Sequence, residues 1–140
     1  MNAKGAVMPQ TITRGIRAML SEARAAVTEV DAKQAIGLAG DDGHVLVDLR
    51  EGREIERDGK IPGAFSCPRG MLEFWIDPES PYHKPVFAQD KAYVFYCASG
   101  WRSALAAQRA AEMGLHPVAH IGGGFAAWVA AGGPVEGKPR

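Results

Sequence analysis

An apolar run at residues 92–96 leads through a short loop into an alanine-rich helical pattern, and this unit restricts the folds open to the chain. The run is short, aromatic and β-branched, which predicts a buried strand. Residues 103–113 carry Leu105 and Arg109 at helical positions, which predicts a helix directly after the strand. A fully apolar strand followed at once by a helix is typical of an α/β fold whose sheet is covered on both faces.

The same alternation of short apolar runs and helical patterns extends along most of the chain. Strands are expected at 28–30, 45–49, 64–67, 92–96 and 118–121. Helices or helical turns are expected at 13–27, 31–39, 50–58, 69–76, 103–113 and 124–131, and residues 77–91 form a connection. We therefore predict an α/β fold, with a central, mostly parallel five-stranded sheet, helices on both faces and an extra N-terminal helix. In such sheets the site lies beyond the carboxyl ends of the strands, where Cys97 falls.

Length and composition predict one globular domain with additional terminal segments. At 140 residues and 46% hydrophobic content, the chain can bury a sizeable core. In residues 13–27 apolar side chains recur on one helical face, which predicts an amphipathic helix. The expected segments are a flexible N-terminus at 1–12, a helical extension at 13–27, the α/β domain at 28–135 and a flexible C-terminus at 136–140.

Charge and apolar content argue against several classes of protein. Sixteen basic residues balance sixteen acidic ones, so no strong field favours nucleic acid or an anionic membrane surface. Residues 1–10 lack the apolar core of a signal peptide, and no later stretch reaches the roughly 18 apolar residues of a membrane span. We expect a cytoplasmic protein that binds neither nucleic acid nor membrane. Two cysteines are too few for a disulfide framework, so both are expected to be free thiols.

Cys97 stands at a strand-to-helix turn, which is a favourable place for a nucleophile. Unpaired N–H groups and the positive end of the helix dipole favour an anion there, and Arg102 adds a permanent positive charge. Both effects favour the thiolate over the thiol. The alternative is a small buried hydrophobic side chain at a strand end. Because Arg102 is the fifth residue after Cys97 and not the sixth, the ring of amides is tight and suits one extra sulfur atom better than a phosphoryl group.

The motif Cys-Ala-Ser-Gly-Trp-Arg-Ser at residues 97–103 resembles the active-site loop of rhodanese-type sulfurtransferases. Three further segments agree with that family in order and spacing. They are Val47–Glu51 followed by Glu54, then Gly59–Ala64, and near the end Gly122–Trp128. The resemblance covers about residues 28–133 and implies a rhodanese-like single-domain sulfurtransferase.

Two positions depart from the family pattern. Lys60 stands where His is usual, in a turn that does not belong to the sulfur site. Ser99 stands where some two-domain members carry a basic residue that helps to bind thiosulfate. The second departure bears on thiosulfate as the natural donor more than on sulfur transfer itself.

The resemblance implies catalysis by double displacement. The Cys97 thiolate takes a sulfur from a small-molecule donor such as thiosulfate, holds it as a persulfide and passes it to cyanide or a thiol, a protein thiol included. The groups expected to bind the persulfide belong to Ala98, Ser99, Gly100, Trp101, Arg102 and Ser103. Arg102 is expected to attract the anionic donor, while Ser103 either donates its hydroxyl to the sulfur or caps the helix. No cofactor and no metal are expected.

Three neighbouring positions have two interpretations each. Arg69 follows a strand end, where it could bind the donor as a second cation or lie solvated at the surface. Cys67 ends the same strand and is either a buried structural thiol or a resolving cysteine that converts the persulfide into a disulfide. Asp48 is expected to hold neighbouring loops together with Arg50 and Glu54, rather than to act as a general base.

The remaining motifs leave other functions open. Glycines 122–124 with Ala127 match a dinucleotide-binding pattern, but only thirteen residues follow Ala127, so we interpret the glycines as a tight turn. The cysteines and histidines lack the pair spacing of a zinc site. His83 is the histidine in a segment expected to overhang the site, and a solvated loop histidine is the favoured interpretation of it. A Cys-dependent phosphatase or arsenate reductase is one alternative, and a non-catalytic rhodanese-like regulatory module is another. Retention of both Cys97 and Arg102 favours an enzyme.

Overall fold

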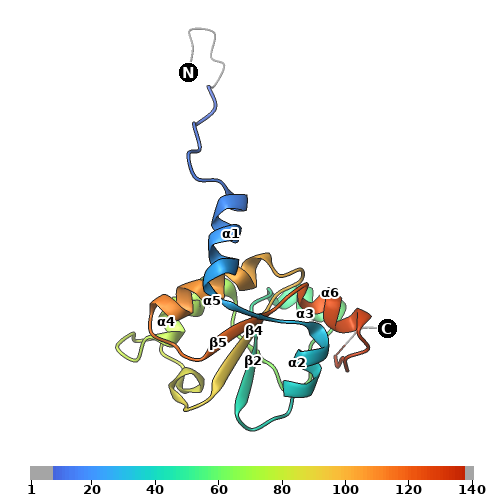
Figure 1. Ribbon diagram of the computed structural model, residues 1–140. Helices are drawn as coiled ribbons and strands as arrows, with labels where there is room; N and C mark the ends of the chain where they lie inside the picture. Colours follow the sequence, from blue (N-terminus) through green and yellow to red (C-terminus); the bar gives the residue numbers. More distant parts are fainter. Residues whose placement is uncertain (1–7, 138–140) are drawn as a thin grey trace.

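The computed structural model describes residues 8–137, and these form a five-stranded parallel sheet between layers of helices (Figure 1). The strands are β1 (Thr28–Val30), β2 (His44–Asp48), β3 (Phe65–Ser66), β4 (Ala92–Tyr96) and β5 (Val118–Ile121). The helices are α1 (Ile16–Ala26), α2 (Ala32–Leu38), α3 (Gly52–Asp58), α4 (Leu72–Ile76), α5 (Trp101–Glu112) and α6 (Gly124–Ala130). The strand order is β1-β5-β4-β2-β3, and all neighbouring strands are parallel. The predicted α/β fold is confirmed.

Local signals account for several of the observed boundaries. The Asp31 side chain accepts the backbone N–H of Gln34, and the Gln34 side chain accepts the N–H of Asp31, each at 2.8 Å, which caps α2. Helix α5 begins at Trp101, two residues before the predicted start, because Gly100 adopts the left-handed conformation with φ 103° and turns the chain into the helix. Strand β3 is shorter than the four residues predicted.

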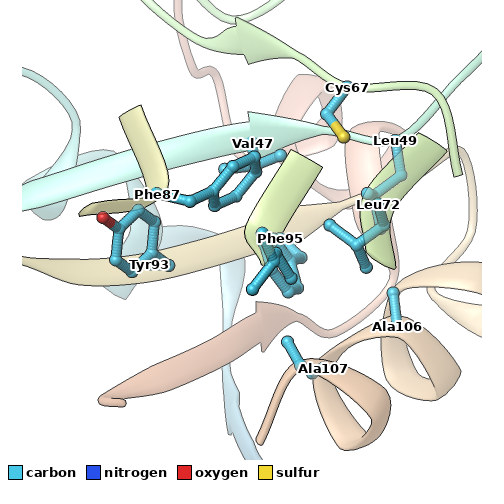
Figure 2. Close-up of a cluster of buried hydrophobic side chains, with 11 residues drawn as sticks. Val47, Leu49, Cys67, Leu72, Phe87, Tyr93, Phe95, Ala106 and Ala107 are labelled. Carbon is cyan, nitrogen blue, oxygen red and sulfur yellow. The ribbon is translucent and has the colours of Figure 1, made fainter. Parts of the chain in front are cut away.

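Alternate residues of the central strands point to opposite faces of the sheet and build two apolar cores. On one face Phe95 of β4 packs with buried side chains of α4 and α5 (Figure 2). On the other face Val94 packs with Ala35 of α2 and Trp128 of α6. Helix α1 packs onto α5 from outside, and residues 8–15 project away from the domain (Figure 1).

Both expected terminal segments lie partly outside the described residues, since positions 1–7 and 138–140 are not described. Within the described part, Glu136 exchanges two backbone hydrogen bonds with Lys60, at 2.9 and 3.0 Å. None of the helices in residues 8–137 combines the length and the apolar character that a membrane crossing requires.

Candidate active site

Cys97 lies at the carboxyl end of the central strand β4 and opens the loop that leads into α5. Its side chain is only 1% exposed, and its Sγ accepts the backbone N–H of Gly100 at 3.1 Å. The left-handed conformation of Gly100 folds the loop back over the sulfur, so that a main-chain donor reaches it. We name residues 97–103 the Cys97 loop. The sequence placed the thiol at this turn, and the structure adds that an amide already contacts it.

The N-terminus of α6 holds the outer side of the Cys97 loop. The N–H of Phe125 donates to the carbonyl of Cys97 at 2.8 Å, and the N–H of Ala126 donates to the carbonyl of Ala98 at 3.2 Å. A Cβ atom on Gly124 would lie 2.5 Å from the Cys97 carbonyl oxygen, so only glycine permits this approach. The glycine run 122–124 is a tight turn, as predicted from the sequence, and the structure adds that the Cys97 loop packs against it.

Arg102 points to α3, where its guanidinium donates two hydrogen bonds of 2.9 Å to the carboxylate of Glu54. The Arg102 hydrogen bonds lower the pKa of Glu54 to about 2. The expected cluster of Glu54 with Asp48 and Arg50 is correct only in part. The charge of Arg50 acts on Glu54, but the Glu54 carboxylate binds Arg102, because the first turn of α3 faces the first turn of α5.

Asp48 and Arg50 form a fully buried ion pair at the end of β2. The Arg50 guanidinium donates to both carboxylate oxygens of Asp48 and to the carbonyl of Gly59. The Tyr96 hydroxyl donates to Asp48 at 2.8 Å, and the Arg50 guanidinium carbon lies 4.2 Å from the ring centre of Phe125. These contacts connect β2, β4 and α6 close to the Cys97 loop and hold the three elements together.

Arg69 and Cys67 lie at the neighbouring strand end and do not contact Cys97 through any described hydrogen bond. Arg69 donates two hydrogen bonds to Glu73, the shorter at 2.9 Å. Cys67 is buried in the apolar core beside Leu49, and Figure 2 shows its sulfur directed toward that side chain. Burial raises the pKa of the Cys67 thiol to about 12, which leaves it protonated at neutral pH.

Ser103 lies inside α5, and Gly100 occupies the N-cap position, so Ser103 is not the helix cap. Its hydroxyl oxygen is 3.7 Å from the Cys97 Sγ and 2.9 Å from Nδ1 of His120. Of the two roles left open by the sequence, capping is excluded, and the expected contact with sulfur is present with Cys97 Sγ as the donor and the Ser103 oxygen as the acceptor.

His120 of β5 is a residue that sequence reasoning missed. The imidazole is completely buried, and its Nε2 lies 3.0 Å from Oε1 of Glu29 on β1. His83 was the histidine expected in a segment over the site, but the histidine that contacts the site, through Ser103, is His120. The available signal was that His120 is a polar residue within an apolar strand, two positions before the glycine turn. The side chains that contact His120 could not be predicted from the sequence, because they depend on which strands are neighbours in the sheet.

Trp101 turns away from the sulfur toward the N-terminal helix. The side chain is 41% exposed, and the guanidinium carbon of Arg17 in α1 lies 6.0 Å from its ring centre. On the other side of the Cys97 loop, a cavity of about 340 Å³ borders Ala98. It is lined by Arg50, Asp58, Ala98, Phe125, Ala126 and Val129. Within residues 8–137 no group of three or more His, Cys, Asp or Glu side chains could hold a metal ion.

Comparison with known families agrees with this arrangement. The family model described as Rhodanese-like domain matches residues 31–131. The chain belongs to the rhodanese-like domain family. The match begins at the cap of α2 and ends after α6, so it includes the Cys97 loop and the glycine turn that seats it.

Curated relatives of this rhodanese-like domain include one with a sulfurtransferase name. The mouse thiosulfate sulfurtransferase/rhodanese-like domain-containing protein 3 is 30% identical over 90 residues, 61% of this chain and 57% of the mouse protein. An uncharacterised protein from Synechocystis is 36% identical over 93 residues, 66% of this chain and 47% of that protein. The chain thus spans about half the length of these curated relatives.

Solved structures with the same fold carry two different functional descriptions. A Rhodopseudomonas palustris protein, described as of unknown function and a possible tyrosine phosphatase, is 64% identical with a TM-score of 0.90, covering 93% of this chain and all of that one (100%). The single-domain sulfurtransferase of Saccharomyces cerevisiae is 29% identical with a TM-score of 0.62, covering 81% of this chain and 96% of that one.

Proposed function

We propose that this rhodanese-like domain is a sulfurtransferase that carries a sulfane sulfur on Cys97. The donor is a small molecule such as thiosulfate, and the acceptor is cyanide or a thiol. The observation that carries the proposal is the contact between the Cys97 Sγ and the Gly100 N–H, at the turn that leads into helix α5. A buried sulfur that accepts a main-chain N–H at a helix start suits an anionic persulfide.

The reaction follows from this geometry in two displacements. The Cys97 thiolate attacks the outer sulfur of thiosulfate, the sulfur–sulfur bond of the donor breaks, and sulfite leaves with the bonding electron pair. The product is a Cys97 persulfide whose outer sulfur carries the negative charge toward the amides of the Cys97 loop. An acceptor thiolate or cyanide then attacks that outer sulfur, and Cys97 leaves as the thiolate.

Phosphoryl transfer is the competing function, and the description of the Rhodopseudomonas relative raises it. Two features argue against it. The Cys97 loop places Arg102 five residues after the cysteine, which leaves a ring suited to a single sulfur atom. Arg102 is also bound in a bidentate pair with Glu54, whereas a phosphatase needs its arginine for the phosphoryl oxygens.

Intact mass after incubation with thiosulfate tests the proposal. The wild-type protein should gain the mass of one sulfur atom, and a reducing thiol should remove it. Cys97→Ser should gain nothing, while the matched variant Cys67→Ser should gain one sulfur, because the Cys67 thiol is buried and protonated. Sulfur uptake that persists in Cys97→Ser would contradict the assignment. Hydrolysis of an aryl phosphate without any persulfide would favour the phosphatase.

A further inference from the structure

Four side chains from separate parts of the fold lie in a row that begins at Cys97. The Cys97 Sγ is 3.7 Å from Ser103 Oγ, and that oxygen is 2.9 Å from His120 Nδ1. His120 Nε2 is 3.0 Å from Glu29 Oε1. Cys97, Ser103 and His120 are at most 1% exposed, whereas the Glu29 side chain is 49% exposed. The row therefore links a buried sulfur to a carboxylate at the surface.

The register of the sheet produces the outer half of this row. Glu29 of β1 stands directly opposite His120 of β5, so both side chains share one face. A Cβ atom on Gly122 would lie 2.8 Å from the Glu29 carboxylate, so the missing side chain gives Glu29 its place along β5. Arg24 of α1 is the other charged group whose field reaches His120. The imidazole thus faces a carboxylate, a guanidinium and a hydroxyl.

The partners of His120 determine where its hydrogen lies. Nε2 is buried without an aligned hydrogen bond, and the half-exposed Glu29 carboxylate at 3.0 Å can reach alignment by a small rotation. Because a carboxylate only accepts, the hydrogen belongs on Nε2, and Nδ1 is left to accept from the Ser103 hydroxyl. The Ser103 oxygen then presents lone pairs to Cys97 and can accept the thiol proton. Every hydrogen in the row points from the sulfur toward Glu29.

We propose that Ser103 and His120 form a proton relay that ionises Cys97. The S–H bond breaks as its proton passes to Ser103 Oγ, while the Ser103 hydroxyl proton passes to His120 Nδ1. The products are the thiolate, a Ser103 hydroxyl that now donates to it, and an imidazolium paired with Glu29. The same path returns the proton when the thiol re-forms. His120 acts through Ser103 and is a positioning residue, and the proposal rests on Cys97 being the nucleophile.

The electrostatic surroundings suit an imidazole that accepts a proton only briefly. Burial lowers the pKa of His120, and the Glu29 carboxylate opposes that effect. The resting imidazole is therefore neutral and free to accept. The imidazolium, once formed, has a counter-charge within 3.0 Å.

Alkylation of Cys97 by iodoacetamide, followed by peptide mass mapping over a range of pH, tests the relay. Ser103→Ala and His120→Gln should each slow alkylation at neutral pH by about tenfold to a hundredfold and shift its rise to higher pH. Because both substitutions break one path, the double variant should be no slower than either single variant. Gly122→Ala displaces Glu29 but keeps the Cys97, Ser103 and His120 side chains, so it should cause a smaller loss. The exposed His116→Gln is the matched control and should behave as wild type.

A second measurement, made on the wild-type protein, tests the relay even if the buried variants fail to fold. Nitrogen-15 NMR of the wild-type protein should show His120 as the tautomer with hydrogen on Nε2. Three results would overturn the relay. The alkylation rate of the double variant could fall by the combined losses of the single variants, or the pH profile of alkylation could be unshifted in folded His120→Gln. The third is NMR evidence of hydrogen on Nδ1 of His120 in the resting wild type. Alkylation needs no sulfur donor. A protein that takes up no sulfur yet shows these shifts would therefore contradict the proposed function and leave the relay standing.

Discussion

Arg102 and Glu54, 48 positions apart in the chain, face each other through two parallel hydrogen bonds of 2.9 Å. The pair ties the first turn of α5 to the first turn of α3, close to the carboxyl end of β4 where Cys97 lies. The charge of Arg102 is thus balanced by a carboxylate before any donor arrives. Cys97 also lies close enough to the guanidinium to help raise the pKa of Arg102, so Arg102 adds its charge to the Gly100 N–H beside the sulfur.

Loss of the Glu54 carboxylate should destabilise the protein in a pH-dependent way. Because the folded-state pKa of Glu54 is depressed to about 2, its contribution is complete above the ordinary value of 4.5 and is lost as pH falls toward 2. We expect Glu54→Gln to lower the free energy of unfolding by about 1 kcal/mol at neutral pH, since Arg102 is partly exposed to water. Denaturant unfolding at neutral and acidic pH measures this difference. If the difference in the free energy of unfolding between wild type and Glu54→Gln grew as pH fell, the predicted direction of the pH dependence would be wrong.

Loop length should decide between sulfur transfer and phosphoryl chemistry. One glycine inserted between Gly100 and Trp101 widens the Cys97 loop and moves Arg102 to the sixth place after Cys97. Sulfur transfer should fall by about 10²-fold because the amide donors no longer converge on the sulfur. Affinity for phosphate or arsenate should rise in the same variant. Steady-state assays of both reactions check this, and unchanged sulfur transfer would remove the main argument against a phosphatase.

The packing of the Cys97 loop against the N-terminus of α6 should be sensitive to one added methyl group. Gly124 has φ 60° and an added Cβ would lie 2.5 Å from the Cys97 carbonyl oxygen, whereas Gly132 has φ 84° and open space around it. Gly132→Ala should lower the free energy of unfolding by about 1 kcal/mol through backbone strain alone. Gly124→Ala should lower it by about 3 kcal/mol or more and reduce sulfur uptake. Equal effects of the two variants on unfolding and uptake would show that the loop does not depend on this contact.

The buried Asp48–Arg50 pair should support stability rather than chemistry. Arg50→Met leaves an uncompensated buried carboxylate and should lower the free energy of unfolding by about 3 to 5 kcal/mol. Adding Asp48→Asn should recover part of that loss, because the unpaired charge is removed. Chemical denaturation of the single and double variants gives the coupling. In the fraction that stays folded, persulfide formation at Cys97 should persist, and its abolition there would indicate a direct role in the reaction.

Features that depend on neighbouring residues could be predicted from the sequence. The aromatic run 92–96 and the alanine-rich pattern after it are a strand and a helix, because periodicity and propensity act within a few residues. The capping of α2 by Asp31 and the glycine turn after β5 are equally local. The motif at 97–103 was sufficient to place the candidate nucleophile and its amides.

Only the tertiary structure decided which distant side chains meet at that nucleophile. Glu54 was grouped with Asp48 along the chain, yet it binds Arg102, since the order of strands brings α3 and α5 together. His120 contacts Ser103 and in turn meets Glu29, because β1 and β5 are paired in a register that no local pattern encodes. Local sequence specifies backbone conformation through short-range sterics and hydrogen bonding, whereas side-chain partners depend on long-range packing of the whole sheet.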